Sequence, residues 1–338
     1  MSLTFKDFKS DQEVRWCPGC GDHAVLAALQ RALPKVSESL NYKKERFVIV
    51  SGIGCSSRLP YYMDTFGFHS IHGRATAVST GIKVANPYLT VWQACGDGDA
   101  LAIGGNHFIH AIRRNIDINI MLFNNRIYGL TKGQYSPTSK FGAITKTSPY
   151  GTVEHPFNPG SLVLGAKGTF FARSLDVELK LNEEILTAAA EHDGCSVVEF
   201  LTNCVIFNDG AHRDLSDPAV RADHTITLRQ GEKMLFGKNK EKGLIYKGDK
   251  LMVVKVGENS ITLDDILTHD AHSDYIGLHM ALAEMKGPDF PVALGVIRDV
   301  KDVTYDDGVR DQVKAVMEKA KIHCMDDLLR SGSTWEVK

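Results

Sequence analysis

Residues 89–99 read LTVWQACGDGD, an apolar run of strand character that stops at Gly96-Asp97-Gly98-Asp99. After Gly98 come 25 residues and then the pair Asn124-Asn125, which follows a second apolar run. The residues between them predict a helix, so the segment has the strand–helix–strand pattern of a parallel sheet. In such a sheet the two strand ends lie side by side. A carboxylate and a carboxamide placed there can converge on a hard divalent cation.

The glycines of this turn predict an anionic ligand beside the cation. Gly96 and Gly98 let the backbone come close to phosphate oxygens. A helix that opens near Asp99 directs N–H groups and its positive dipole end toward the same oxygens. The segment therefore predicts a site for a divalent metal and a diphosphate.

Short apolar runs alternate with helix-period stretches on both sides of this segment. The alternation predicts an α/β fold with a doubly wound, mostly parallel sheet, whose ligands gather at the carboxyl ends of the strands. We expect one domain over residues 1–210 and a C-terminal extension over residues 211–338, in which a strand at 251–256 precedes an acidic, amphipathic tail. The expected strands lie at residues 47–50, 89–95, 118–123 and 196–201, and the expected helices at residues 22–33, 75–85, 100–114 and 182–192.

A long loop follows the Asn pair. Residues 129–160 are rich in Gly, Pro, Ser and Thr. A loop of this length inside a compact domain is usually either functional or disordered.

The overall composition fits a soluble cytoplasmic enzyme. The 338 residues include 39 basic and 41 acidic side chains, so their charges nearly cancel and favour neither nucleic acid nor an anionic membrane as a partner. The first residues lack a secretory pattern, and no apolar run approaches the roughly 20 residues that span a bilayer. Seven cysteines, an odd number without an export signal, argue against a disulfide framework.

The cysteines form a second group of candidate ligands. Cys17 and Cys20 stand two residues apart in a tight turn before a helical stretch, so two soft ligands can face one metal. Taken alone, the pair fits half of a zinc site, a redox dithiol or two ligands of an iron–sulfur cluster. A zinc site needs a second pair at a suitable spacing, which the sequence lacks. A redox dithiol usually opens a helix after a strand, and no strand precedes Trp16.

An iron–sulfur cluster needs four thiolates, so two more cysteines must complete the set. Cys55 follows a predicted strand and faces the same crevice as Gly96-Asp97-Gly98. Cys204 lies past the carboxyl end of the strand at 196–201, whereas Cys195 lies at its amino end, so topology favours Cys204. The remaining cysteines are Cys95, which we expect to pack into the sheet, and Cys324, which the tail leaves unassigned.

Five motifs in this order resemble the β subunit of the 2-oxoacid:ferredoxin oxidoreductases. They are WCPGCG at 16–21, GIGCSS at 52–57, HGRA at 72–75, GDGDA at 96–100 and NNxxYGLTKGQ at 124–134. The resemblance covers about residues 10–210. It implies a thiamine-diphosphate-binding fold that also holds Mg²⁺ and one [4Fe–4S] cluster.

The resemblance also implies a role for each matching residue. The cluster ligands would be Cys17, Cys20, Cys55 and Cys204, and the Mg²⁺ ligands Asp97, Asn125 and the backbone carbonyl of Ile127. For His72 the alternative is a polar cap on the helix that begins near Ala75. The diphosphate and thiazolium contacts would be Ile53, Gly54, Cys55, Ser56, His72, Gly98, Asp99, Gly129 and Leu130.

The implied reaction is the oxidative decarboxylation of a 2-oxoacid with coenzyme A, with electrons passing through the cluster to ferredoxin. A thiazolium ring is the electron sink for decarboxylation, and a nearby cluster accepts single electrons. Arg58 could bind the distal carboxylate of 2-oxoglutarate in bidentate fashion, and the alternative is an exposed loop arginine. Lys132 is a second candidate cation, for which a solvated loop position is an equal alternative.

We expect the chain to be incomplete as a catalyst. No glutamate can be nominated to activate the aminopyrimidine, so an α subunit is expected to supply this acid in an αβ or α₂β₂ hetero-oligomer. Pyruvate or a branched-chain 2-oxoacid is the alternative substrate. A non-oxidative thiamine-dependent decarboxylase would not need four thiolates, and a zinc-stabilised scaffold subunit would not need thiamine.

Overall fold

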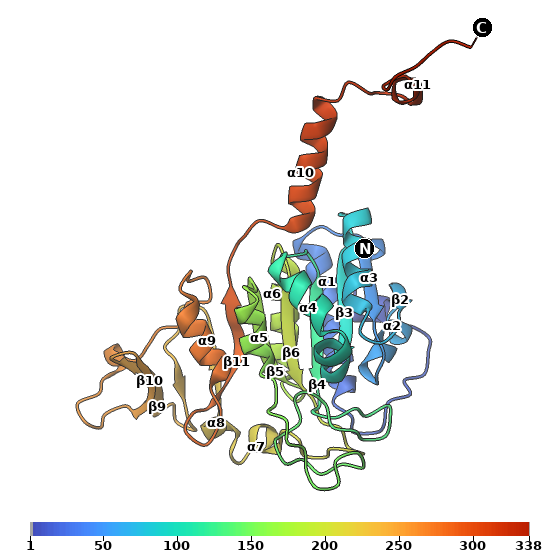
Figure 1. Cartoon of the computed structure of the whole chain (residues 1–338). Coiled ribbons are helices and arrows are strands. Elements are labelled where there is room, and N and C mark those ends of the chain that lie inside the picture. Colours follow the sequence, from blue (N-terminus) through green and yellow to red (C-terminus); the bar gives the residue numbers. More distant parts are fainter. Residues whose placement is uncertain (1–2, 338) are drawn as a thin grey trace.

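The computed structural model describes residues 3–337. Within these residues eight strands form one sheet in the order β2-β1-β3-β4-β6-β5-β11-β7 (Figure 1). All neighbours are parallel except β5 and β11. The strands are β1 Phe47–Ser51, β2 Phe66–His69, β3 Thr90–Gly96, β4 Asn119–Asn124, β5 Phe170–Leu175, β6 Ser196–Leu201, β7 Thr225–Leu228 and β11 Val292–Asp299.

Helices cover both faces of this sheet (Figure 1), which confirms the expected doubly wound α/β fold. Two long helices pack against each other on one face, and four helices cover the other. The first face carries α1 Asp22–Ser39 and α6 Leu179–Glu191; the second carries α3 Ala75–Ala85, α4 Gly105–Arg113, α5 Pro159–Gly165 and α9 Ile276–Glu284.

The part after residue 210 contributes both to the sheet and to a separate arm. Strands β7 and β11 extend the main sheet across the boundary expected at residue 210. The strand expected at 251–256 is present as β10 Lys250–Lys255, in a small antiparallel sheet with β8 Leu235–Phe236 and β9 Lys242–Lys247. The tail forms α10 Tyr305–Glu318 and α11 Met325–Leu329, which project from the body (Figure 1).

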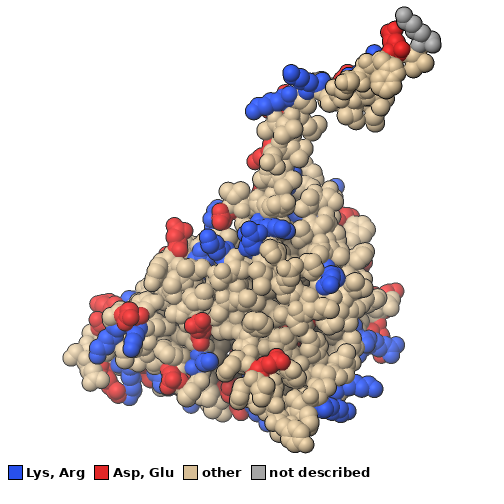
Figure 2. All heavy atoms as spheres, in the orientation of Figure 1, with Lys and Arg blue, Asp and Glu red and all other residues tan. Residues whose placement is uncertain are grey.

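The visible surface has no field of a single charge sign. Figure 2 shows Lys and Arg side chains intermixed with Asp and Glu side chains, in keeping with the 39 basic and 41 acidic residues. No helix within residues 3–337 is both long enough and apolar enough to cross a membrane.

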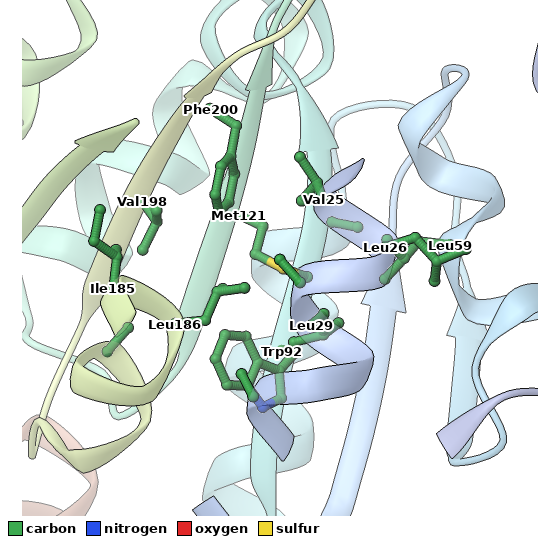
Figure 3. Packing of buried hydrophobic residues seen from close by; sticks show 14 of the residues in the cluster. Val25, Leu26, Leu29, Leu59, Trp92, Met121, Ile185, Leu186, Val198 and Phe200 are labelled. Carbon is green, nitrogen blue, oxygen red and sulfur yellow. The ribbon is translucent and has the colours of Figure 1, made fainter. Parts of the chain in front are cut away.

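Alternating side chains of the central strands divide the core into two layers. Trp92 of β3 and Met121 of β4 point toward α1 and α6, where they meet Leu29 and Leu186 (Figure 3). Their neighbours Val91 and Ile120 belong to the cluster on the opposite face, because successive side chains of a strand point to opposite sides. The strands are therefore apolar on both faces, as expected for a sheet covered on both sides.

The expected strands agree with the observed ones, and three of the four expected helices differ at their ends; the helix expected at 182–192 is α6, which starts three residues earlier, at Leu179. The four expected strands and the helix at 75–85 match within one residue. The helix expected at 22–33 continues to Ser39 through Pro34, because Leu33 and Val36 are fully buried and their packing offsets the lost backbone hydrogen bond. The helix expected at 100–114 begins instead as a π-helix, Asp99–Ile103, and Gly104 separates it from α4.

Several short elements complete the described chain. They lie mainly in the connections between strands and helices. They are the α-helical turns α2 Leu59–Tyr62, α7 Arg213–Ser216 and α8 Arg221–His224, and the 3-10 turns Phe5–Phe8, Lys44–Arg46, Ser56–Arg58 and Leu263–Asp265.

Candidate functional site

The carboxyl ends of β1, β3 and β4 open onto one pocket. The register pairs Ser51 with Ala94 and Gly96 with Phe123, so the loops that leave these strands start close together. Every residue expected to contact the diphosphate cofactor or its metal lines this pocket, which we call the cofactor pocket. These residues are Ile53, Gly54, Cys55, Ser56, His72, Asp97, Gly98, Asp99, Asn125, Ile127, Gly129 and Leu130.

Asp97 brings a buried carboxylate to the cofactor pocket. Only 1% of the residue is exposed. Burial raises the pKa of Asp97 to about 6, although hydrogen bonds from Ser136 and Thr138 act in the opposite direction. No lysine or arginine within residues 3–337 forms an ion pair with this carboxylate. A divalent cation would therefore compensate a buried charge that the chain leaves unpaired.

Asp99 links the turn after β1 to the turn after β3. Its Oδ1 accepts hydrogen bonds from the backbone N–H of Ile53 at 3.2 Å and of Gly73 at 2.7 Å, and it pairs with His72 Nδ1 at 2.5 Å. Gly52 permits this approach, because a Cβ added there would lie 2.0 Å from Asp99 Oδ2. The carboxylate of Asp99 orients His72. His72 is not the cap of α3, because the N-cap of that helix is Arg74.

The turn after β4 presents oxygen atoms toward the same pocket. Asn125 Oδ1 accepts a hydrogen bond from the N–H of Ile127 at 3.1 Å, and Asn208 Nδ2 donates to the Asn125 carbonyl at 2.9 Å. Tyr128 Oη donates to the Gly98 carbonyl at 2.9 Å, which joins this turn to the one after β3. Carboxamide and carbonyl oxygens are hard ligands of the kind that Mg²⁺ prefers.

Four of the seven cysteines line a second pocket of about 200 Å³, which we call the cysteine pocket. Cys17 and Cys20 come from the turn before α1, Cys55 follows β1, and Cys204 follows β6. These are the four cysteines that the sequence analysis selected. The two pockets adjoin, since both are lined by Cys55, Asn125, Gly129 and Leu130.

The other three cysteines lie elsewhere. Cys95 and Cys195 are fully buried in the core layer that contains α3 and α4. Cys324 is exposed on the C-terminal arm. The expectation that Cys95 packs into the sheet is confirmed.

The thiols of the cysteine pocket lie close enough to influence one another. A Cβ added to Gly129 would lie 3.5 Å from Cys55 Sγ and 3.6 Å from Cys204 Sγ, so this residue packs between two thiols. Burial, followed by the negative charge of Asp22, raises the pKa of Cys55 to about 11 and also raises the pKa of Cys20. A positively charged centre would instead favour the thiolates. The described residues contain no group of three His, Cys, Asp or Glu side chains spaced to hold a single metal ion.

The two basic side chains that could bind the substrate, Arg58 and Lys132, differ in position. Arg58 lines the cysteine pocket and also a third pocket of about 420 Å³, which adjoins the cofactor pocket at Ile53, Gly54 and Leu130. Lys132 is exposed and lines none of these three pockets. The structure therefore brings Arg58, but not Lys132, to a pocket that adjoins the cofactor pocket.

Buried polar residues beneath the pocket were not assigned a role from the sequence. Ser136 and Thr138, in the long loop, hydrogen-bond to Asp97. His212 is 3% exposed, and its Nε2 donates to the Asn124 carbonyl at 2.9 Å. The only signal in the sequence is the run of hydroxyl residues after the Asn pair, and it does not specify which carboxylate they contact.

Comparison with known proteins decides the family. Residues 52–200, which include the whole cofactor pocket, match the family described as the C-terminal TPP-binding domain of thiamine pyrophosphate enzymes. The chain is 48% identical over 335 residues to the 2-oxoglutarate oxidoreductase subunit KorB of Mycobacterium tuberculosis, and the alignment covers 98% of this chain and 88% of that protein. The chain belongs to the β subunits of the 2-oxoacid:ferredoxin oxidoreductases.

Two further relatives support this membership of the β-subunit family. The β subunit of 2-oxoacid:ferredoxin oxidoreductase 1 from Aeropyrum pernix is 45% identical over 194 residues, which cover 57% of this chain and 60% of that protein. A solved structure of 2-oxoglutarate:ferredoxin oxidoreductase from Magnetococcus marinus, with 2-oxoglutarate, coenzyme A and succinyl-CoA bound, matches with a TM-score of 0.76 and 30% identity. That match covers 98% of this chain and 97% of the other.

We predict that His212 makes this β subunit sensitive to acid. Burial, followed by the charge of Arg126, lowers the pKa of His212 to about 3. The folded chain keeps the imidazole neutral, while the unfolded chain protonates it below its ordinary pKa of about 6.5, so folding stability falls as the pH drops below that value. Between about pH 6.5 and pH 5 this group should remove about 2 kcal/mol.

Urea unfolding at about pH 7.5 and about pH 5 measures this effect. His212→Asn should lose less stability between the two pH values than the wild type. His323→Asn, which removes an exposed histidine, should behave like the wild type. An unchanged pH difference in His212→Asn would show that another group titrates.

Proposed function

We propose that this β subunit carries the thiamine diphosphate and a [4Fe–4S] cluster of a 2-oxoglutarate:ferredoxin oxidoreductase. Such an enzyme converts 2-oxoglutarate, coenzyme A and oxidised ferredoxin into succinyl-CoA, CO₂ and reduced ferredoxin. The observation that carries the proposal is that the cofactor pocket and the cysteine pocket share Cys55 and Gly129. A cluster held there would adjoin the organic cofactor whose electrons it must accept.

Asp97, Asn125 and the carbonyl of Ile127 are the proposed Mg²⁺ ligands, and the turns after β1 and β3 would hold the diphosphate. The support is the unpaired, buried carboxylate of Asp97 and the hard oxygens of the turn after β4. Bound thiamine diphosphate supplies the electron sink that decarboxylation of a 2-oxoacid requires. The residues that line the cofactor pocket would bind and orient the cofactor.

Cys17, Cys20, Cys55 and Cys204 are the proposed cluster ligands. The support is that all four line one pocket, although they come from three separate parts of the chain. Four thiolates around a positively charged iron–sulfur core would relieve the electrostatic penalty that raises the pKa values of Cys20 and Cys55.

Arg58 is the proposed contact for the distal carboxylate of the substrate. It lines the third pocket, whose volume of about 420 Å³ gives room for a small acid beside the cofactor pocket. A guanidinium can bind a carboxylate through two parallel hydrogen bonds. The M. tuberculosis relative is a 2-oxoglutarate oxidoreductase subunit and the M. marinus structure has 2-oxoglutarate bound, which favours this substrate over pyruvate. Lys132 would contact the substrate only after a movement of its loop.

We propose that the chain acts with an α subunit. Its relatives are named as subunits, and the A. pernix relative is the β subunit of a 2-oxoacid:ferredoxin oxidoreductase. The buried Glu199 is paired with Arg173 at 2.6 Å beneath the sheet edge, so it is not available to activate an aminopyrimidine ring. The α subunit would supply that acid and part of the coenzyme A site, in an αβ or α₂β₂ assembly.

Replacing Cys204 with Ser should remove most of the iron and labile sulfide and nearly all oxidative activity. The reason is that a hydroxyl is a poor substitute for a cluster thiolate. Cys195→Ser is the matched control, because Cys195 is buried away from the pocket, and it should retain iron per folded chain. Iron, sulfide, zinc and thiamine are measured on the anaerobically purified αβ complex.

The same measurements separate the alternatives. Thiamine without iron in the wild type would indicate a non-oxidative decarboxylase, and zinc without thiamine would indicate a scaffold subunit. Loss of iron from Cys195→Ser but not from Cys204→Ser would reverse the ligand assignment.

Arg58→Leu should raise KM for 2-oxoglutarate by about 100-fold, because a hydrogen bond to a charged group contributes about 1.5–3 kcal/mol. The KM for pyruvate, which has no distal carboxylate, should change by less than about threefold. A viologen-linked assay of the αβ complex with both substrates measures the split. Arg330→Leu, an exposed arginine of the C-terminal arm, is the matched control. Equal increases for both substrates would remove the specificity role of Arg58.

A further inference from the structure

Two hydroxyl groups of the long loop hold the Asp97 carboxylate from one side. Ser136 Oγ donates to Asp97 Oδ2 at 2.5 Å, and Thr138 Oγ1 donates to the same oxygen. Ser136 is 3% exposed and Thr138 is 4% exposed, so water does not compete for these bonds. Because both bonds end on Oδ2, the other carboxylate oxygen takes no hydroxyl from the loop and is left for another ligand.

A second group of buried polar side chains lies against Thr138. Asn124 Nδ2 donates to Glu199 Oε1 at 2.7 Å, so the amide must turn its Oδ1 toward Thr138, whose hydroxyl lies 2.9 Å away. Glu199 is itself held by Arg173 Nε at 2.6 Å, and both side chains are almost fully buried. A hydroxyl has one proton to donate, and the charged carboxylate of Asp97 is a stronger acceptor than the Asn124 carbonyl, so Thr138 donates to Asp97 while Asn124 Oδ1 only lies beside the hydroxyl.

The loop is also tied to the turn after β4. Ser139 Oγ donates to the Arg126 carbonyl at 2.7 Å and accepts the N–H of Ser136 at 2.8 Å. The segment around Ser136 and Thr138 thus bridges the ends of β3 and β4. These are the two strand ends that carry the proposed metal ligands.

We propose that Ser136 and Thr138 are positioning residues that turn the Asp97 carboxylate toward Mg²⁺ and fix the long loop on the metal site. This inference rests on the proposed function, since it assumes that Asp97 binds the metal of thiamine diphosphate. The two hydroxyls restrict the carboxylate to one orientation before the metal arrives. The same bonds anchor the loop that carries Gly129 and Leu130, two residues of the cofactor pocket. Metal binding and loop placement are therefore linked through a single carboxylate.

Removing either hydroxyl should weaken Mg²⁺-dependent binding of thiamine diphosphate. A hydrogen bond to a charged group contributes about 1.5–3 kcal/mol, and about 1.4 kcal/mol corresponds to a tenfold change in affinity. Thr138→Val keeps the shape of the side chain, and Ser136→Ala leaves a small space. Each should raise the Mg²⁺ concentration for half-maximal cofactor binding by about tenfold or more.

The experiment titrates Mg²⁺ at fixed thiamine diphosphate on the full chain in its αβ complex, with calorimetric detection of cofactor binding. Thr138→Ser keeps the hydroxyl and should bind as the wild type does. Thr145→Val removes a hydroxyl of the same loop that contacts Ser148 instead of Asp97, so it should leave the titration unchanged. Urea unfolding of the metal-free complex shows whether each variant is folded. If Thr138→Val is unfolded, Ser136→Ala and the hydroxyl-keeping Ser136→Thr carry the comparison.

The Mg²⁺ titrations test the proposed function and the positioning role of Ser136 and Thr138 separately. A wild-type complex that binds no thiamine diphosphate with Mg²⁺ contradicts the proposed function and, with it, the basis of this inference. A wild type that binds, together with folded Thr138→Val and Ser136→Ala variants that need no more Mg²⁺ than the wild type, overturns the positioning role alone. A shift in Thr145→Val as large as that in Thr138→Val would also overturn it. A shift confined to Thr138→Val and Ser136→Ala, with rescue in Thr138→Ser, supports it.

Discussion

The alignment of the carboxyl ends of β1, β3, β4 and β6 is the constraint on which the rest of this structure depends. The strands are adjacent and parallel in the order β1-β3-β4-β6, and backbone pairing fixes their register. Gly96 lies opposite Phe123, and Asn124 lies opposite Leu201. The chain that leaves each strand therefore enters the same small region, where residues more than 100 positions apart can line common pockets.

The strand ends concentrate polar groups that only partly satisfy one another. Asp99 accepts hydrogen bonds on Oδ1 from the turn after β1 and from Gly73, and the same oxygen pairs with His72. Asp97 differs in its partners, since its side-chain partners in the described chain are two neutral hydroxyls. A buried carboxylate without a cation is costly, and this cost would become binding energy when a metal arrives. The same reasoning applies to the partly buried thiols of Cys20 and Cys55, whose raised pKa values oppose ionisation until a positive centre is present.

The sequence predicted the parts of the fold whose pattern is local. The strands at the site have continuous apolar runs, and the helix over residues 75–85 has clear boundaries. The sequence did not predict β2, because all four residues of this edge strand are exposed and show no buried pattern. It also did not predict β5, whose apolar run is interrupted by Arg173. That side chain is tolerated only because Glu199 of the neighbouring strand pairs with it, a contact that no local pattern reveals.

The sequence likewise identified some residues of the candidate site and missed others. The motifs identified most of the cofactor pocket, since three of them follow β1, β3 and β4, whose ends topology brings together. The Cys17 and Cys20 motif precedes α1 instead of following a strand, and Cys204 lies in no motif and was selected from its place after β6. The hydrogen bonds from Ser136 and Thr138 to Asp97 were not predicted. They join residues 39 and 41 positions apart, and the composition of a long loop does not determine where the loop lies. Lys132 illustrates the same limit, because its neighbours in the motif line the cofactor pocket while its own side chain faces solvent.

We propose that one sheet edge holds an organic electron donor next to an iron–sulfur acceptor. The most direct test of this proposal is an anaerobic titration of the αβ complex with 2-oxoglutarate and coenzyme A, without any external acceptor, followed by visible absorbance. The account predicts that the substrate bleaches the cluster absorbance as electrons pass into it. Decarboxylation that releases CO₂ and an aldehyde while the absorbance stays unchanged would contradict it.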